Sequence, residues 1–136
     1  MDLSELDSRQ IAIILSRARC VLGLTCIFLP GVVTRVLFGT NDSAARAATR
    51  FVGIRDLALG VGALTNLKER NQDAEWLSMG AISDGVDGIT SLLQRGLPAR
   101  SRLIGAGALG TGAFLLKLSR DLAAERNGVV DVTAIV

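Results

Sequence analysis

The stretch LIGAGALGTGAFLL, residues 103–116, contains one hydroxyl side chain and no charged side chain. A helix formed by this stretch is apolar on every side, which is typical of a helix enclosed in a large core or surrounded by lipid. Helices of a soluble four-helix bundle instead carry one apolar stripe and an opposite polar face. Because four helices cannot easily enclose one of their number, the stretch favours a membrane location over a soluble bundle.

Three further apolar stretches precede this one, each about the length of a membrane-spanning helix. A helix needs about 20 mostly apolar residues to cross roughly 30 Å of hydrocarbon. The pattern therefore predicts an all-α fold, a four-helix transmembrane bundle with short polar connections. Its predicted spans are residues 10–29, 44–67, 74–94 and 99–118.

The segments outside the spans carry helix-start and helix-stop signals. Pro30-Gly31 ends or kinks the first helix, and residues 32–39 are expected to form a short helix at the membrane interface. Residues 41–43, Asn-Asp-Ser, are typical of a helix N-cap.

Residues 1–118 are expected to form a single membrane domain, followed by a C-terminal tail at 119–136. The tail is expected to begin as a helix, to stop at Asn127-Gly128 and to be mobile beyond that point.

The overall composition excludes several classes of protein. Of the 136 residues, 49% are apolar and 21% are charged, with no histidine and a net charge of +2. Scattered basic residues and 4% aromatics disfavour nucleic-acid binding. Cys20 and Cys26 match neither a zinc nor a CxxC pattern, so they are interpreted as small packing residues. The sequence predicts no catalytic residue, no metal and no cofactor.

The 15 glycines suggest close helix packing, because small residues let helices approach one another in membranes. In the fourth span, two small-residue pairs have the spacing of such motifs. These pairs either pack within the bundle or present a face to another protein. The residues of this possible packing face are Ala106, Ala108, Gly110 and Gly112.

Charged residues inside the spans are costly and mark either function or obligatory pairing. The second and third spans are expected to form a hairpin around residues 68–73, which brings their charges to one depth. Arg19 of the first span reaches a similar depth. The predicted intramembrane layer is Arg19, Arg55, Asp56, Asp84 and Asp87. It either holds the helices together or serves as a proton or cation relay or a site for a polar headgroup.

Two motifs in these spans resemble those of a known family. The segment RFVGIRDLALGVGAL, residues 50–64, is followed by SDGVDG at 83–88. Together they resemble an uncharacterised, largely actinobacterial family of small four-helix membrane proteins with an Arg-Asp-Leu-Ala-Leu-Gly-like second helix and paired aspartates in the third. The resemblance implies the topology and the importance of the charged layer, and it supplies no activity.

We expect a small non-catalytic integral membrane protein that contacts membrane lipids. It would be an accessory or stabilising subunit of a larger assembly, such as a multi-subunit lipid or solute transporter of an actinobacterium. The alternative is a self-sufficient oligomeric transporter or channel that uses the charged layer. The expected location is the bacterial inner membrane. Six basic residues fall on each side of the membrane in this topology, so their count gives no preferred orientation. Arg17 lies near the side that holds the termini, which favours cytoplasmic termini.

Overall fold

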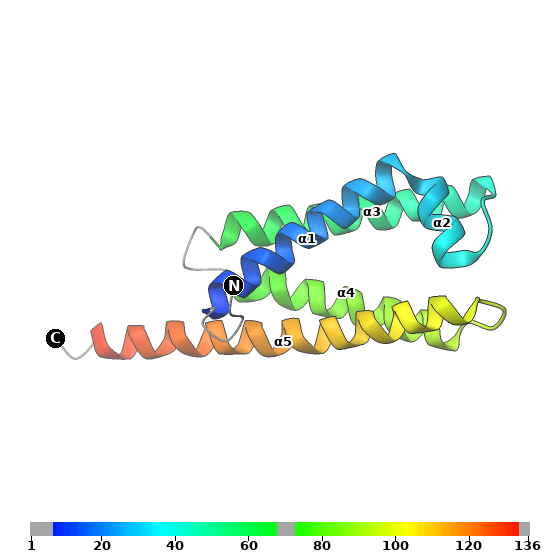
Figure 1. Cartoon of the computed structure of the whole chain (residues 1–136). Helices are drawn as coiled ribbons and strands as arrows, with labels where there is room; N and C mark the ends of the chain where they lie inside the picture. The colour runs from blue at the N-terminus through cyan, green and yellow to red at the C-terminus, as the bar shows by residue number, and fades with distance from the viewer. Residues whose placement is uncertain (1–6, 68–72, 134–136) are drawn as a thin grey trace.

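The computed structural model describes residues 7–67 and 73–133, and every element within these ranges is a helix. The all-α class is therefore confirmed for the described part of the chain. Figure 1 shows the helices α1 to α5 in chain order. Their bounds are α1 Ser8–Phe28, α2 Pro30–Phe38, α3 Ser43–Asn66, α4 Asp73–Leu93 and α5 Ala99–Thr133.

The helix ends follow local chemistry. Pro30 is the first residue of α2, where its missing N–H and fixed φ suit a helix start. Gly39 ends α2 with φ 71°, a left-handed conformation that favours glycine. Asp42 caps α3, because its carboxylate accepts the N–H of Ala45 at 2.8 Å. These ends match the expected kink and cap.

The helices form two layers of two (Figure 1). In one layer α1 packs along α3, and in the other α4 packs along α5. Contacts between the layers are sparser, including those between α3 and α4, which the sequence predicts as a hairpin. The short helix α2 packs on α3 and also reaches α5, where Arg100 donates to the carbonyl of Arg35 at 2.8 Å.

Glycines set the close approach within each layer. An ideal Cβ placed on Gly23 of α1 would lie 2.7 Å from the carbonyl oxygen of Gly53 of α3. In the second layer, a Cβ on Gly88 of α4 would lie 2.7 Å from the carbonyl oxygen of Gly105 of α5. Because backbone atoms occupy these positions, larger residues would push the helices apart.

The interior of the bundle is built mainly from small residues and a few leucines. Its apolar cluster comprises Ala12, Ala63, Leu67, Leu77, Ala81, Leu115 and Leu118. Cys26 is buried and Cys20 is half-buried, both as free thiols. Large apolar side chains lie mostly outside: Phe28 is 75% exposed and Phe51 is 72% exposed.

Helix α1 is long and apolar enough to cross a membrane, by length and composition. It is the one such helix among the residues that the structure describes. In α3, the charges at positions 46, 50, 55 and 56 leave no stretch of 18 residues with two charges or fewer.

The C-terminal helix is longer than predicted. The expected stop at Asn127-Gly128 is wrong, since α5 continues to Thr133. A glycine stop needs the left-handed conformation, and positive φ in the described residues occurs at Gly39 and Gly96 and not at Gly128. Glycine inside a helix costs only about 1 kcal/mol, which a continuing helix tolerates.

Candidate functional site

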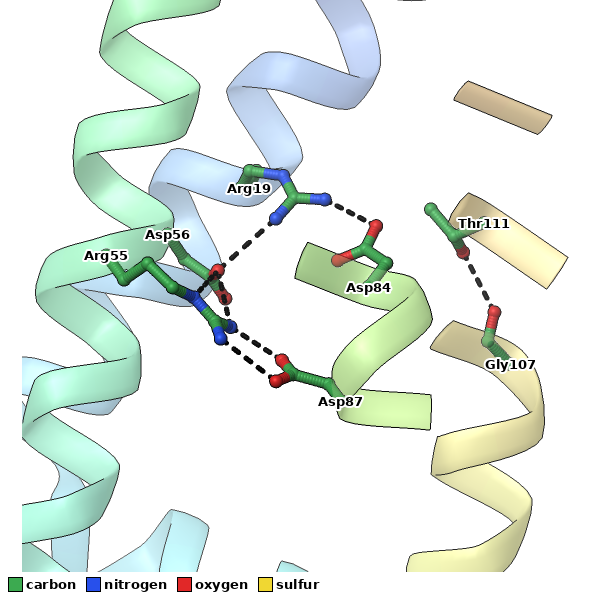
Figure 2. A network of polar contacts seen from close by, with 7 residues as sticks. All are labelled: Arg19, Arg55, Asp56, Asp84, Asp87, Gly107 and Thr111. Atoms are coloured by element: carbon green, nitrogen blue, oxygen red, sulfur yellow. Dashed lines mark hydrogen bonds and ion pairs between the residues drawn. The ribbon is translucent and has the colours of Figure 1, made fainter. Parts of the chain in front are cut away.

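The predicted charged residues come together between the two helix layers (Figure 2). One helical turn of α3 supplies Arg55 and Asp56, and one turn of α4 supplies Asp84 and Asp87 at the i,i+3 spacing that places them on one face. Arg19 reaches them from α1. We call these five residues the ionic network.

Arg19 bridges the two layers. Its guanidinium donates to Asp56 Oδ1 at 3.2 Å on α3 and to Asp84 Oδ2 at 2.5 Å on α4. The side chain of Arg19 is 12% exposed, and those of Asp56 and Asp84 are 7% and 13% exposed. Ion pairs this well buried are screened little by solvent, so each depends strongly on its partner.

Arg55 makes the second bridge, with bidentate geometry. It donates to the two carboxylate oxygens of Asp87 at 2.9 Å and 2.6 Å. It also donates to Asp56 Oδ1, at 3.1 Å and 3.3 Å. Arg55 and Asp87 are 35% and 37% exposed, so this end of the network lies nearer the surface. The planar guanidinium suits this paired recognition better than an ammonium group does.

Asp56 is the centre of the network, since its Oδ1 accepts from both arginines. Two arginines and three aspartates give the network a formal charge of −1. Arg17 and Arg50, the nearest other arginines in the sequence on α1 and α3, are both exposed. These two arginines therefore do not neutralise the formal charge of −1 in the network.

A cavity of about 370 Å³ lies beside the network, between the two layers. Arg19, Asp56 and Asp84 form part of its wall, together with the hydroxyl-bearing Ser16 and Thr111. Most of the remaining lining is aliphatic. Such a cavity, apolar with a few convergent polar groups, has the character of a ligand site, where roughly 300–1,000 Å³ is typical.

Two hydroxyl-bearing residues of the cavity wall are absent from the sequence-based prediction. Ser16 precedes Arg19 by three residues and so shares its helix face. Thr111 is the single hydroxyl of residues 103–116, and its hydroxyl donates to the carbonyl of Gly107 at 3.0 Å (Figure 2). The spacing of Ser16 from Arg19 and the polarity of Thr111 in an apolar stretch are signals that the sequence contains. The cavity itself depends on how the two helix layers pack, which the sequence does not show.

The predicted small-residue face of α5 divides into two parts. Gly112 is buried, and a Cβ there would lie 2.8 Å from the carbonyl oxygen of Ala81 on α4. Ala108 is half-buried and lines the cavity. Ala106 and Gly110 are exposed, and a Cβ at Gly110 would meet no atom within 4 Å. The face thus packs within the bundle on one side and is open on the other.

The described residues contain no group of three or more His, Cys, Asp or Glu side chains placed to hold a metal ion. Comparisons with known protein families, with curated proteins and with solved structures give no match to this chain. The resemblance to a small actinobacterial membrane family stays a prediction.

Proposed function

We propose that the chain is a multi-pass, non-catalytic protein of the bacterial inner membrane that serves as an accessory subunit of a larger membrane assembly. The observation that carries the membrane part is the distribution of its large apolar side chains. They point outward on all four long helices, while small residues, a few leucines and the ionic network fill the interior. In this arrangement α1, α3, α4 and α5 cross the bilayer, and α2 lies at its interface.

Large apolar side chains are exposed on all four long helices, whereas an ordinary soluble monomer rarely exposes large contiguous apolar patches. Leu93 is 76% exposed on α4 and Leu103 is 75% exposed on α5, alongside Phe28 and Phe51 in the other layer. Lipid would cover these side chains. The buried Asp56 supports the same setting, because ionised residues in membrane bundles face the interior and pair there.

The accessory role is supported by α5. A Cβ at Gly107 or Gly110 would meet no atom within 4 Å, so this part of the helix is open to a partner helix. With 35 residues, α5 is about 52 Å long against about 31 Å for the 21-residue α4. Its C-terminal end extends beyond the other helices (Figure 1). The host assembly we propose is a multi-subunit lipid or solute transporter, in keeping with the small size of the chain. The resemblance and the excess of arginine over lysine, 13 to 2, suggest an actinobacterial source.

The test is purification of the tagged full-length chain from its native membrane in a mild detergent, with mass spectrometry of the copurifying proteins. We expect a stoichiometric membrane partner, which is lost when Gly107→Leu and Gly110→Leu are combined. Ala58→Leu, also a small exposed position but on α3, is the matched control and should retain the partner. A chain that purifies only as a monomer or homodimer would contradict the accessory role.

A second candidate function is transport by an oligomer of this chain alone. The observation that favours it is the formal charge of −1 in the ionic network, beside a cavity, which could attract a proton or cation. Four helices enclose little space, so the pathway would need a second copy. Cation or proton flux in liposomes that is lost on Asp84→Asn would support transport, and flux that is unchanged by this substitution would exclude it.

A further inference from the structure

The cavity beside the ionic network has one polar end. Arg19, Asp56 and Asp84 contribute a formal charge of −1 to its wall. The Arg19 hydrogen bonds fall on Oδ1 of Asp56 and on Oδ2 of Asp84. Oδ1 of Asp84 receives no hydrogen bond in the described part of the chain. An ionised carboxylate oxygen acts as a hydrogen-bond acceptor and not as a donor. This end of the cavity therefore calls for a hydrogen-bond donor with a positive charge.

Apart from the hydroxyl groups of Ser16 and Thr111, the rest of the cavity wall is apolar. Its walls come from all four long helices, so a bound molecule would contact both layers. The aliphatic lining includes Leu15, Leu22, Leu59, Leu77, Ile104 and Leu115. Such walls suit a hydrocarbon chain, which is held by burial of apolar surface and not by directional bonds.

The cavity opens sideways between α1 and α5. Leu22 of α1 and Ile104 of α5 both line it, yet they are 52% and 44% exposed. These two helices contact each other sparsely, in contrast to the tight pairs within each layer. In a bilayer this opening would face the lipid, so a molecule dissolved in the membrane could enter without passing through water.

We propose that this cavity binds an amphiphile with an ammonium headgroup, seated on Asp84, and a single hydrocarbon chain, seated among the leucines. Figure 2 shows Asp84 between Arg19 and the α5 segment that carries Thr111, where a headgroup could also meet a hydroxyl oxygen. The inference rests on the membrane location proposed above and is independent of the accessory role.

The test uses the purified full-length chain in a neutral detergent at pH 7, titrated with dodecylamine, dodecanol or sodium dodecanoate and followed by native mass spectrometry. The three probes share a chain and differ in the head, and the amine is protonated at this pH, as a lysine is. We expect dodecylamine to bind most tightly. Equal binding of the three probes would overturn the headgroup assignment.

Two charge variants locate the headgroup. Asp84→Asn and Asp87→Asn each change the formal charge of the network from −1 to 0, but only Asp84 lines the cavity. Asp84→Asn should weaken dodecylamine binding about tenfold or more, the loss expected for one charge-assisted hydrogen bond. Asp87→Asn should keep most of the affinity. An equal loss in both variants would show diffuse attraction by the network and would overturn the site.

Two further variants locate the chain and guard against misfolding. Ala108→Phe would fill the cavity, whereas Ala113→Phe adds the same bulk at an exposed position of α5 that does not line it. Only Ala108→Phe should abolish binding, with both variants keeping the thermal unfolding temperature of the parent within a few degrees. Undiminished binding to Ala108→Phe would overturn the proposal. Membrane insertion, measured separately by alkaline extraction, tests the proposed location.

Discussion

Arg19 is the residue on which the union of the two helix layers depends most. It pairs with Asp56 on one side and with Asp84 on the other, and all three side chains are largely buried. Arg55 makes more hydrogen bonds but lies nearer the surface with Asp87. Because the contacts between the layers are otherwise sparse, the ionic network ties the layers together, and three of its five residues also line the cavity.

Replacing Arg19 with methionine tests this role. Arg19→Met leaves the buried Asp84 without its partner and Asp56 paired with Arg55 alone. We therefore expect the free energy of unfolding to fall by about 3–5 kcal/mol. Adding Asp84→Asn to Arg19→Met should recover part of the loss, because a neutral amide replaces one uncompensated charge. Unfolding in mixed detergent micelles would measure both changes.

The matched control is Arg17→Met, two residues earlier on α1 and exposed. Surface substitutions of this kind change stability by roughly 0.5 kcal/mol or less. If Arg19→Met were no more destabilising than Arg17→Met, the network would not hold the layers together.

At the scale of one helix, the start of α3 depends on Asp42. Its carboxylate accepts the Ala45 N–H, and the Thr40 hydroxyl donates to it at 2.9 Å. These hydrogen bonds hold the pKa of Asp42 below its usual value of 3.8. The capping contribution is therefore complete above pH 3.8 and disappears as the pH falls through the lowered pKa.

The cap can be tested by its dependence on pH. Asp42→Ala should lower the thermal unfolding temperature at pH 7, and the difference from the parent should shrink in acid. Asp42→Asn keeps a capping oxygen that does not titrate, so it should be nearly as stable as the parent at pH 7 and become the more stable of the two as the parent loses its cap in acid. A deficit of Asp42→Ala that grows as the pH falls would contradict this account.

Between helices, the crossing of α1 and α3 depends on Gly23. Gly23→Ala places a methyl group against the backbone of α3, so we expect a loss of about 1–3 kcal/mol, as for overpacked cores. The control is Gly110→Ala, where the new methyl meets no atom within 4 Å and the helix gains propensity. Thermal unfolding of the two variants should shift in opposite directions, and a neutral Gly23→Ala would show that the helices cross elsewhere.

At the scale of the whole molecule, the proposed topology places both ends of the bundle on one side. Cysteines introduced by Asp7→Cys and Glu125→Cys should react alike with an impermeant maleimide in intact cells, in a background without Cys20 and Cys26. Gln94→Cys, in the connection between α4 and α5, should show the opposite accessibility. Equal labelling at all three positions would exclude four crossings.

The sequence by itself determined the helical class, the break in the first helix at Pro30-Gly31, the helix start near Asp42, and the residues of the charged layer. These are local signals: apolar length, proline and cap chemistry, and charges that stand out in apolar stretches. The tertiary structure decided that α1 pairs with α3 and α4 with α5, that Asp56 is shared by two arginines, and that a cavity lies beside Asp84. Those features depend on which helix faces meet, and one sequence with many small residues is compatible with several such pairings.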